Sequence, residues 1–322
     1  MLPYGQSLTL LTDLYQLTMA AAAWKSGVDK REGMFHLLFR RSPFQGGFTV
    51  AAGLATALDY LRAWRFAEDD LAYLASVRTA AGELMFEPAF IEHLRALEPR
   101  LDIDAVPEGT VVFPQEPLLR VSGPVVPCML LAILASNELD EHLIESLKQQ
   151  GARVTVWGVG TRLVTGGDEP ALGGVYKLSA VRDAGGPWKP RIKLSEQSAK
   201  ISLPGVLQIR RFFAEGQMAG DLIYDVQDGA SSQTIVDPLD ITRRKTLPPA
   251  TPFEDLLVPV WRNGKQVYDS PALADLRARA QAQLGMLHPG IKRFVNPHTY
   301  PAGLDPVLHE RRTKMILQAR AA

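Results

Sequence analysis

The chain has 322 residues and a mass of 35.4 kDa, more than the ~250–300 residues at which single cores stop growing, which predicts two or three domains or one large barrel with additions. Hydrophobic residues make up 46% and charged residues 22%, as in folded globular chains and unlike disordered ones. The 35 basic residues equal the 35 acidic ones, so there is no overall positive field to attract nucleic acid or anionic lipid, and we expect a small-molecule partner.

The single cysteine, Cys128, excludes an internal disulfide and a cysteine-rich metal site, and we interpret it as a buried thiol in a reducing compartment. The longest apolar stretch, residues 125–135, contains Pro127 and is shorter than the ~18–20 residues that span a bilayer. The first residues lack the basic region of a secretory signal. These features predict a cytoplasmic protein without a membrane segment.

The first hundred residues have mixed helix and strand patterns. Apolar residues at helical spacing predict a helix over 13–24, and an aromatic-rich run predicts a strand over 34–41. Further helices are expected at 53–60, 69–74 and 88–97. This part of the chain is therefore predicted to be α+β.

In the middle of the chain the sequence pattern changes to short strands. Short β-branched runs bounded by proline and glycine predict strands at 106–114 and 118–121. We expect a helix at 136–151, a strand at 153–157 and a glycine loop after it. This order of elements is typical of a parallel α/β structure. Another strand is expected at 175–178.

The last part of the chain is predicted to be β-rich before it becomes helical. Residues 188–270 have the pattern of strands and loops, with a hairpin turn at Asn263 and Gly264. Helices are expected at 273–284 and, as an amphipathic segment, at 306–322.

Two features are candidate ligand sites. Gly158, Gly160 and Thr161 follow a predicted strand, where glycines let backbone N–H groups approach a phosphate and the hydroxyl adds a donor, although a tight turn explains the same spacing. Tyr15 lies beside polar neighbours on the first helix and could cover a flat ligand, or it could be a half-buried tyrosine at a domain edge.

Basic residues and histidines carry weaker signals. Arg40 and Arg41 could hold a phosphate or a carboxylate, or lie in a solvated loop, and for Lys193 and Lys200 we favour a surface loop. The six histidines show no metal-ligand spacing, so no structural zinc site is predicted.

Four segments, in chain order, resemble the nicotinate phosphoribosyltransferase family: residues 12–19, 109–114, 157–163 and 170–178, with 193–196 and 296–300 extending the match. The resemblance implies a type II phosphoribosyltransferase-like fold, with an α/β barrel domain beside an α+β domain built from both chain ends. It also implies homodimers that share active sites. The family reaction joins nicotinate to phosphoribosyl pyrophosphate, giving nicotinate mononucleotide for NAD synthesis, with ATP hydrolysis coupled through a phosphorylated histidine.

The resemblance also implies site residues. Tyr15 matches the family's nicotinate-stacking tyrosine, and Thr161, with Gly158 and Gly160, matches the contact to phosphoribosyl pyrophosphate. ATP and Mg²⁺ are expected to take part, without a tightly bound cofactor and without a metal site assigned to this chain.

The resemblance is interrupted at residues 129–137, where a family helix is fused to a strand that normally comes much later. In the family the missing stretch carries the phosphorylated histidine and the arginine that grips the nicotinate carboxylate, so no catalytic residue is assigned. An eight-stranded barrel takes about 250 residues, so a closed one is excluded here. We expect an α+β domain over 1–116, an incomplete α/β barrel over 117–183, and strands and helices over 184–322 that return to the first domain.

Three interpretations stay open. The chain is an internally deleted enzyme without activity, a non-catalytic subunit that keeps the dimer surface, or an artefactual sequence of a full-length active enzyme.

Overall fold

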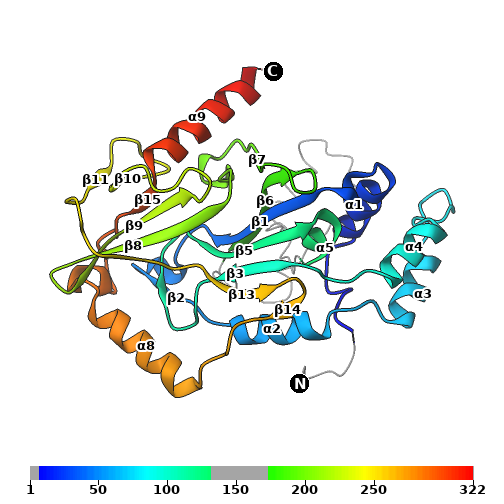
Figure 1. The fold of residues 1–322 in the computed structure, drawn as a ribbon, viewed down its shortest axis with the longest axis horizontal. Coiled ribbons are helices and arrows are strands. Elements are labelled where there is room, and N and C mark those ends of the chain that lie inside the picture. The colour runs from blue at the N-terminus through cyan, green and yellow to red at the C-terminus, as the bar shows by residue number, and fades with distance from the viewer. Residues whose placement is uncertain (1–6, 132–172, 322) are drawn as a thin grey trace, which may run out of the picture.

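The computed structural model describes residues 7–131 and 173–321, in which two large sheets are flanked by helices (Figure 1). In the first sheet every adjacent pair of strands is antiparallel. In spatial order its seven strands are β14 (Lys265–Gln266), β13 (Val258–Arg262), β3 (Asp102–Ala105), β5 (Pro117–Pro124), β1 (Glu32–Phe39), β6 (Gly174–Arg182) and β7 (Lys189–Pro190). This sheet joins strands from both ends of the chain.

The two faces of the first sheet differ because alternate residues of a strand point to opposite sides. On one face Phe35, Val121 and Tyr176 belong to one apolar cluster, and the rings of Phe35 and Tyr176 stack with centroids 5.0 Å apart. Helices α2 (Leu54–Ala63) and α5 (Val125–Leu130) contribute to the same cluster and cover this face. The other face carries polar side chains and is turned toward the second sheet.

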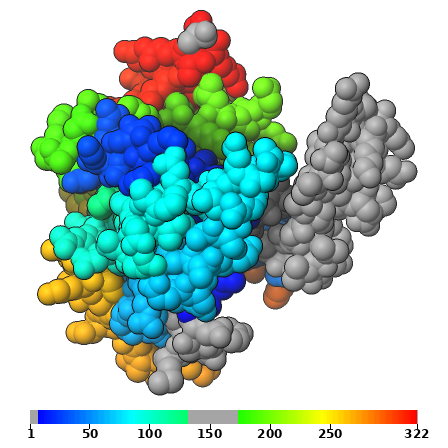
Figure 2. Space-filling view, turned by 90° about the vertical axis from the view of Figure 1, so that its right-hand side faces the viewer, coloured from blue at the N-terminus to red at the C-terminus, as the bar shows by residue number. Residues whose placement is uncertain are grey.

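A separate helical layer packs against α5, beyond the end of strand β5 in the first sheet (Figure 1). It consists of α1 (Leu14–Lys25), α3 (Glu68–Ser76) and α4 (Pro88–Arg95), whose buried side chains form one apolar cluster with part of α5. Figure 2 looks onto the side of the molecule where α1 (blue) and α3 and α4 (cyan) form the surface.

The second sheet contains one parallel pair, β9 with β15, and is otherwise antiparallel. In spatial order its strands are β11 (Arg244–Thr246), β10 (Thr234–Val236), β15 (Ala302–Leu304), β9 (Gln217–Asp225), β8 (Leu207–Ala214) and β12 (Phe253–Asp255). A small ladder of β2 (Thr49–Val50) and β4 (Val111–Val112) lies beside α8 (Leu273–Gly285), whose Gln283 Oε1 accepts the N–H of Val111 at 3.0 Å.

Many of the expected elements are confirmed, notably α1, β1, β6 and α8, and so is the turn at Asn263 and Gly264, where both residues have positive φ as a two-residue hairpin requires. The single strand expected at 106–114 is wrong. The chain pairs as β3 before that segment and as β4 near its end, because Pro107 and the left-handed Gly109 turn the backbone between them.

The C-terminal helix also differs from expectation. Helix α9 (Pro306–Ala321) was expected to be amphipathic, yet it buries only Leu308 and Arg312. Charged residues are spread around its circumference, so it extends away from the second sheet (Figure 1).

The expected parallel barrel strands are not found among the described residues. Within 117–183 the described strands are β5 and β6, and both pair antiparallel with β1 in the first sheet. Strand β1 is apolar enough to be a central strand, so it takes a neighbour on each edge. The helix expected at 136–151 and the strand at 153–157 lie outside the described residues, and the three-part division of the chain stays a prediction.

Candidate functional site

A pocket opens on the polar face of the first sheet, where the end of β1 lies beside β6. Alternate residues line it: His36 and Leu38 of β1 face Lys177 and Val175 of β6, their register partners, and Arg40 follows one residue after the strand. Because the period of a strand is two residues, these side chains project to one side of the sheet. The strand pairing thus brings together residues that are far apart in the sequence.

A loop of the second half of the chain closes the pocket. Residues 199–203 and Leu207 form its far wall, and Gln115 completes the lining. The N–H of Lys193 donates to Ser202 Oγ at 2.8 Å, and the N–H of Ser202 donates to the carbonyl of Lys193 at 3.2 Å. This pair of hydrogen bonds closes the loop upon itself and holds Lys200 over the pocket.

The pocket is cationic. Within residues 7–131 and 173–321, its lining includes Arg40, Lys177 and Lys200 and no aspartate or glutamate. The pKa of Lys177 lies below its usual value, first because the ammonium is partly buried and then because Lys193 and Arg40 repel it. A bound anion would relieve that repulsion, so the arrangement favours a phosphate or carboxylate ligand.

His36 forms the floor of the pocket and is buried and neutral. Its Nε2 accepts the N–H of Leu207 at 3.2 Å, so the proton sits on Nδ1, which donates to Ser179 Oγ at 2.8 Å. The hydroxyl of Ser179 donates in turn to the carbonyl of Met34 at 3.1 Å. Burial, and secondarily the nearby Arg120, lowers the pKa of His36 to about 3.

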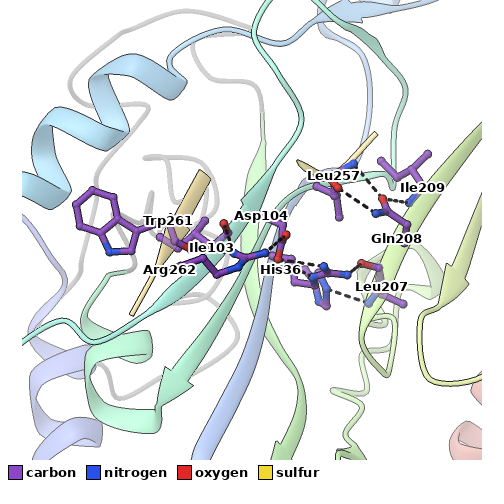
Figure 3. A network of polar contacts seen from close by, with 10 residues as sticks. His36, Ile103, Asp104, Leu207, Gln208, Ile209, Leu257, Trp261 and Arg262 are labelled. Carbon is purple, nitrogen blue, oxygen red and sulfur yellow. Dashed lines mark hydrogen bonds and ion pairs between the residues drawn. The ribbon is translucent and has the colours of Figure 1, made fainter. Parts of the chain in front are cut away.

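A network of polar contacts leads from His36 along the same face of the sheet (Figure 3). In the strand register, Arg120 of β5 lies opposite His36 of β1 and opposite Asp104 of β3. Arg120 Nη2 lies 3.0 Å from Asp104 Oδ2, and Arg262 Nη2 donates to Asp104 Oδ1 at 2.6 Å. The carboxylate of Asp104 is thereby shared between two arginines, at the end of the network away from the pocket.

Of the sequence-predicted site residues, Tyr15 alone lies in the described part of the chain. Tyr15 lies on α1, half-exposed, and does not line the pocket; its hydroxyl accepts from Gln16 Nε2 at 3.1 Å. Partial burial, with the charge of Asp13 adding to it, raises the pKa of Tyr15. Gly158, Gly160 and Thr161 lie outside the described residues.

The weaker basic candidates have different positions. Arg40 and Lys200 line the pocket, Lys193 lies close enough to affect Lys177, and Arg41 is exposed outside the lining. The preferred interpretation of Lys193 and Lys200 as surface residues agrees with their exposure but missed that their loop closes a pocket.

Lys177 and His36 were not singled out from the sequence. Each is a polar residue in a strand that is otherwise largely apolar, at positions that alternate with buried aromatic residues. That alternation marks a side chain on the opposite face of the sheet, and it was the signal available for both residues.

Within residues 7–131 and 173–321 there is no group of three histidine, cysteine, aspartate or glutamate side chains arranged to hold a metal ion. In the same part of the chain no helix is both long enough and apolar enough to cross a membrane.

Two family models match the chain. Residues 10–139 match the nicotinate phosphoribosyltransferase N-terminal domain, and residues 208–312 match the C-terminal domain of the same enzyme.

Individual relatives show two patterns of similarity. The nicotinate phosphoribosyltransferase of Bacillus subtilis is 24% identical over 475 aligned positions, covering 95% of both chains. Because the chain has 322 residues, at least 153 of those positions lie opposite gaps. The human enzyme is 47% identical over 123 residues, which are 38% of this chain and 22% of the human one, and the Caenorhabditis elegans enzyme is 42% identical over 123 residues.

A solved structure supports the fold. The crystal structure of human nicotinic acid phosphoribosyltransferase superimposes with a TM-score of 0.70 at 21% identity, covering 95% of this chain and 100% of that one. At this identity the match concerns the fold alone: a type II phosphoribosyltransferase-like fold, in which the described residues contain no closed barrel.

Proposed function

The chain belongs to the nicotinate phosphoribosyltransferase family, and from this membership we propose that its cationic pocket binds the diphosphate group used in forming nicotinate mononucleotide from nicotinate and phosphoribosyl pyrophosphate. The observation that carries the proposal is the pocket lining, which contains Arg40, Lys177 and Lys200 and, among the residues that the structure describes, no carboxylate.

The chemistry of the reaction explains why such a pocket is needed. Negative charge develops on pyrophosphate as its bond to the ribose breaks, and fixed cations stabilise that charge. The planar guanidinium of Arg40 can contact two oxygens at once, whereas Lys177 and Lys200 act as point charges. Partial burial of Lys177 strengthens its interaction with an anion because less water screens it.

The remaining site residues enter the proposal through the family resemblance. We assign Tyr15 to stacking on the pyridine ring, and Gly158, Gly160 and Thr161 to the phosphate of phosphoribosyl pyrophosphate. Tyr15 is exposed enough for such contact, and it lies outside the pocket lining. This separation suits an active site that two subunits complete together.

The described residues do not fit a resident magnesium ion. Mg²⁺ is usually held by one or two carboxylates together with substrate phosphates, and the described part of the pocket lining has no carboxylate. We therefore propose that Mg²⁺ and ATP act as dissociable reactants and assign no protein ligand to either.

Calorimetry with inorganic pyrophosphate tests the pocket. Lys177→Met should weaken binding about tenfold or more, since one charge-assisted contact is worth ~1.5–3 kcal/mol. The matched control is Lys189→Met, because Lys189 is exposed, pairs with Asp183 at 3.6 Å and does not line the pocket. Equal binding by the two variants, or no binding by the parent, would overturn the assignment.

Turnover is tested separately. The purified chain is supplied with nicotinate, phosphoribosyl pyrophosphate, ATP and Mg²⁺, and nicotinate mononucleotide is measured. Product formation that disappears in Lys177→Met supports the full reaction. Pyrophosphate binding without product limits the function of this chain to binding.

A second candidate function is that of a non-catalytic subunit paired with a longer relative. It is favoured by α1, where Leu14, Tyr15 and Met19 are each close to half exposed and Leu11 is exposed just before the helix. Copurification with the Bacillus subtilis relative, followed by light scattering, tests it. A discrete mixed dimer supports this function, and two separate species exclude it.

A further inference from the structure

We propose that His36 is a positioning residue for the cationic pocket: by accepting the N–H of Leu207 it fixes the loop that carries Lys200 over Arg40 and Lys177. The inference rests on the proposed binding of a diphosphate in this pocket and adds a residue that the family assignment does not include.

The hydrogen bonds around His36 define one orientation of its ring. Nε2 accepts from Leu207 while Nδ1 donates to Ser179, whose own proton goes to the carbonyl of Met34. Each donor in this chain has one acceptor. A flipped ring would put Cε1 and Cδ2 at the positions of Nε2 and Nδ1 and lose both hydrogen bonds, and a proton on Nε2 would face the N–H of Leu207. The imidazole is thus an acceptor held in place by β1 and β6.

Leu207 is where the closing loop becomes strand β8, and the first sheet holds it from two strands. Its N–H is bonded to His36 of β1, and its carbonyl accepts from Arg120 Nη1 of β5 at 3.0 Å. Figure 3 shows His36 and Leu207 meeting between the two sheets. Two residues earlier, the N–H of Gly205 donates to the carbonyl of Ser179 at 2.9 Å.

These anchors determine where the closing loop lies. One end is held by the paired bonds of Lys193 and Ser202, and the other by Leu207. Lys200 and Ile201, inside the loop that Lys193 and Ser202 close, form the wall opposite Lys177 together with Ser202. Without the acceptor at position 36, the buried N–H of Leu207 is unpaired and the loop must be ordered when the anion binds.

The experiment compares three variants in calorimetry with inorganic pyrophosphate and in hydrogen exchange of the segment 200–207. His36→Phe keeps an aromatic ring without the acceptor, and should bind about tenfold more weakly, with faster exchange in this segment. His36→Gln restores an acceptor and should stay within about threefold of the parent. Arg262→Leu is the control, because it breaks the polar network at Asp104 and should lower stability without changing affinity.

A milder variant covers the case in which His36→Phe does not fold. Ser179→Ala removes the hydroxyl that holds Nδ1 and should shift affinity and exchange in the same direction, by a smaller factor. Parent-like affinity and exchange in a folded His36→Phe or in Ser179→Ala overturn the positioning role, as does His36→Gln binding as weakly as His36→Phe. If the parent binds no pyrophosphate, the proposed function fails, and the exchange data alone decide whether His36 anchors the loop.

Discussion

The guanidinium of Arg211 and the carboxylate of Asp221 form an ion pair with no exposed area on either side chain. Arg211 Nη1 also donates to Gln283 Oε1 at 2.9 Å and Nη2 to the carbonyl of Val111 at 2.8 Å, while the Tyr300 hydroxyl donates to Asp221 Oδ1 at 2.8 Å. One pair therefore ties β8 and β9 to β4, to α8 and to the segment before β15.

Breaking this pair should be costly. We expect Arg211→Met to lower the free energy of unfolding by ~3–5 kcal/mol, because the buried carboxylate of Asp221 loses its partner. Urea denaturation measures the change. Arg62→Met is the control, since the Arg62–Asp59 pair is largely exposed and should matter far less. Similar losses in the two variants would contradict the argument.

The proton that Glu116 holds in the folded protein contributes to the free energy of unfolding, and this contribution falls as pH rises. Burial, and then the charge of Asp221, raises the pKa of Glu116 well above its usual value, so the folded protein holds a proton that the unfolded chain releases above about pH 4.5. Its contribution is complete below that pH and is lost as pH rises toward the raised pKa. Glu116→Gln should flatten the decline in urea midpoints measured from pH 5 upward, and an unchanged slope would count against this assignment.

His36 has the opposite effect: its contribution to the free energy of unfolding falls as pH is lowered. Its pKa of about 3 in the folded protein lies below the ordinary value of 6.5, so the unfolded chain binds a proton first as pH falls. Stability should decline between pH 6.5 and 3 by up to about 1.4 kcal/mol per pH unit from this residue. His36→Gln should reduce that slope, and thermal unfolding across the range measures it. An identical acid limb in parent and variant would show that His36 is not the group responsible.

Gly205 should not tolerate a side chain. Its φ is +105°, and a Cβ there would collide with Asp225 Oδ2, the carboxyl whose other oxygen accepts the N–H of Val206 at 3.3 Å. We expect Gly205→Ala to cost ~1–3 kcal/mol. Gly216→Ala is the control, because its φ is +74° in open space and it carries the backbone strain alone, about 1 kcal/mol. Urea midpoints should therefore rank Gly205→Ala as the less stable, and the reverse order would refute the steric argument.

Substitutions at two leucines of α1 should affect folding and association separately. Leu17 is buried in the helical cluster whereas Leu14 is 48% exposed. Leu17→Asp should unfold the protein, because it buries an unpaired charge. Leu14→Asp should leave the circular dichroism spectrum intact and reduce the mass found by light scattering, if α1 forms the proposed dimer surface. A parent that is a 35.4 kDa monomer would exclude that surface.

The sequence by itself determined the elements that depend on near neighbours. The helix α1, the strand β6 and the turn at Asn263 and Gly264 each depend on residues within a few positions of one another, and the structure confirms them. The buried face of α1 differs from the predicted one, because Gln16, Leu17 and Ala20 are buried and Leu14 is exposed. Family membership also came from the sequence, because the matching segments keep their order along the chain. The glycine loop at 158–161 is a local signal of the same kind, and its role stays a prediction.

Only the tertiary structure decided which strands pair, and with that the composition of the pocket. Placing β5 and β6 on either side of β1 puts Arg120, His36 and Lys177 in one row, although the three residues are widely separated in the chain. Pairing depends on which distant apolar faces can be buried together, and local pattern does not specify that. For the same reason His36 reads as an ordinary strand residue in the sequence, while the fold makes it a buried acceptor for a backbone N–H of the opposite sheet.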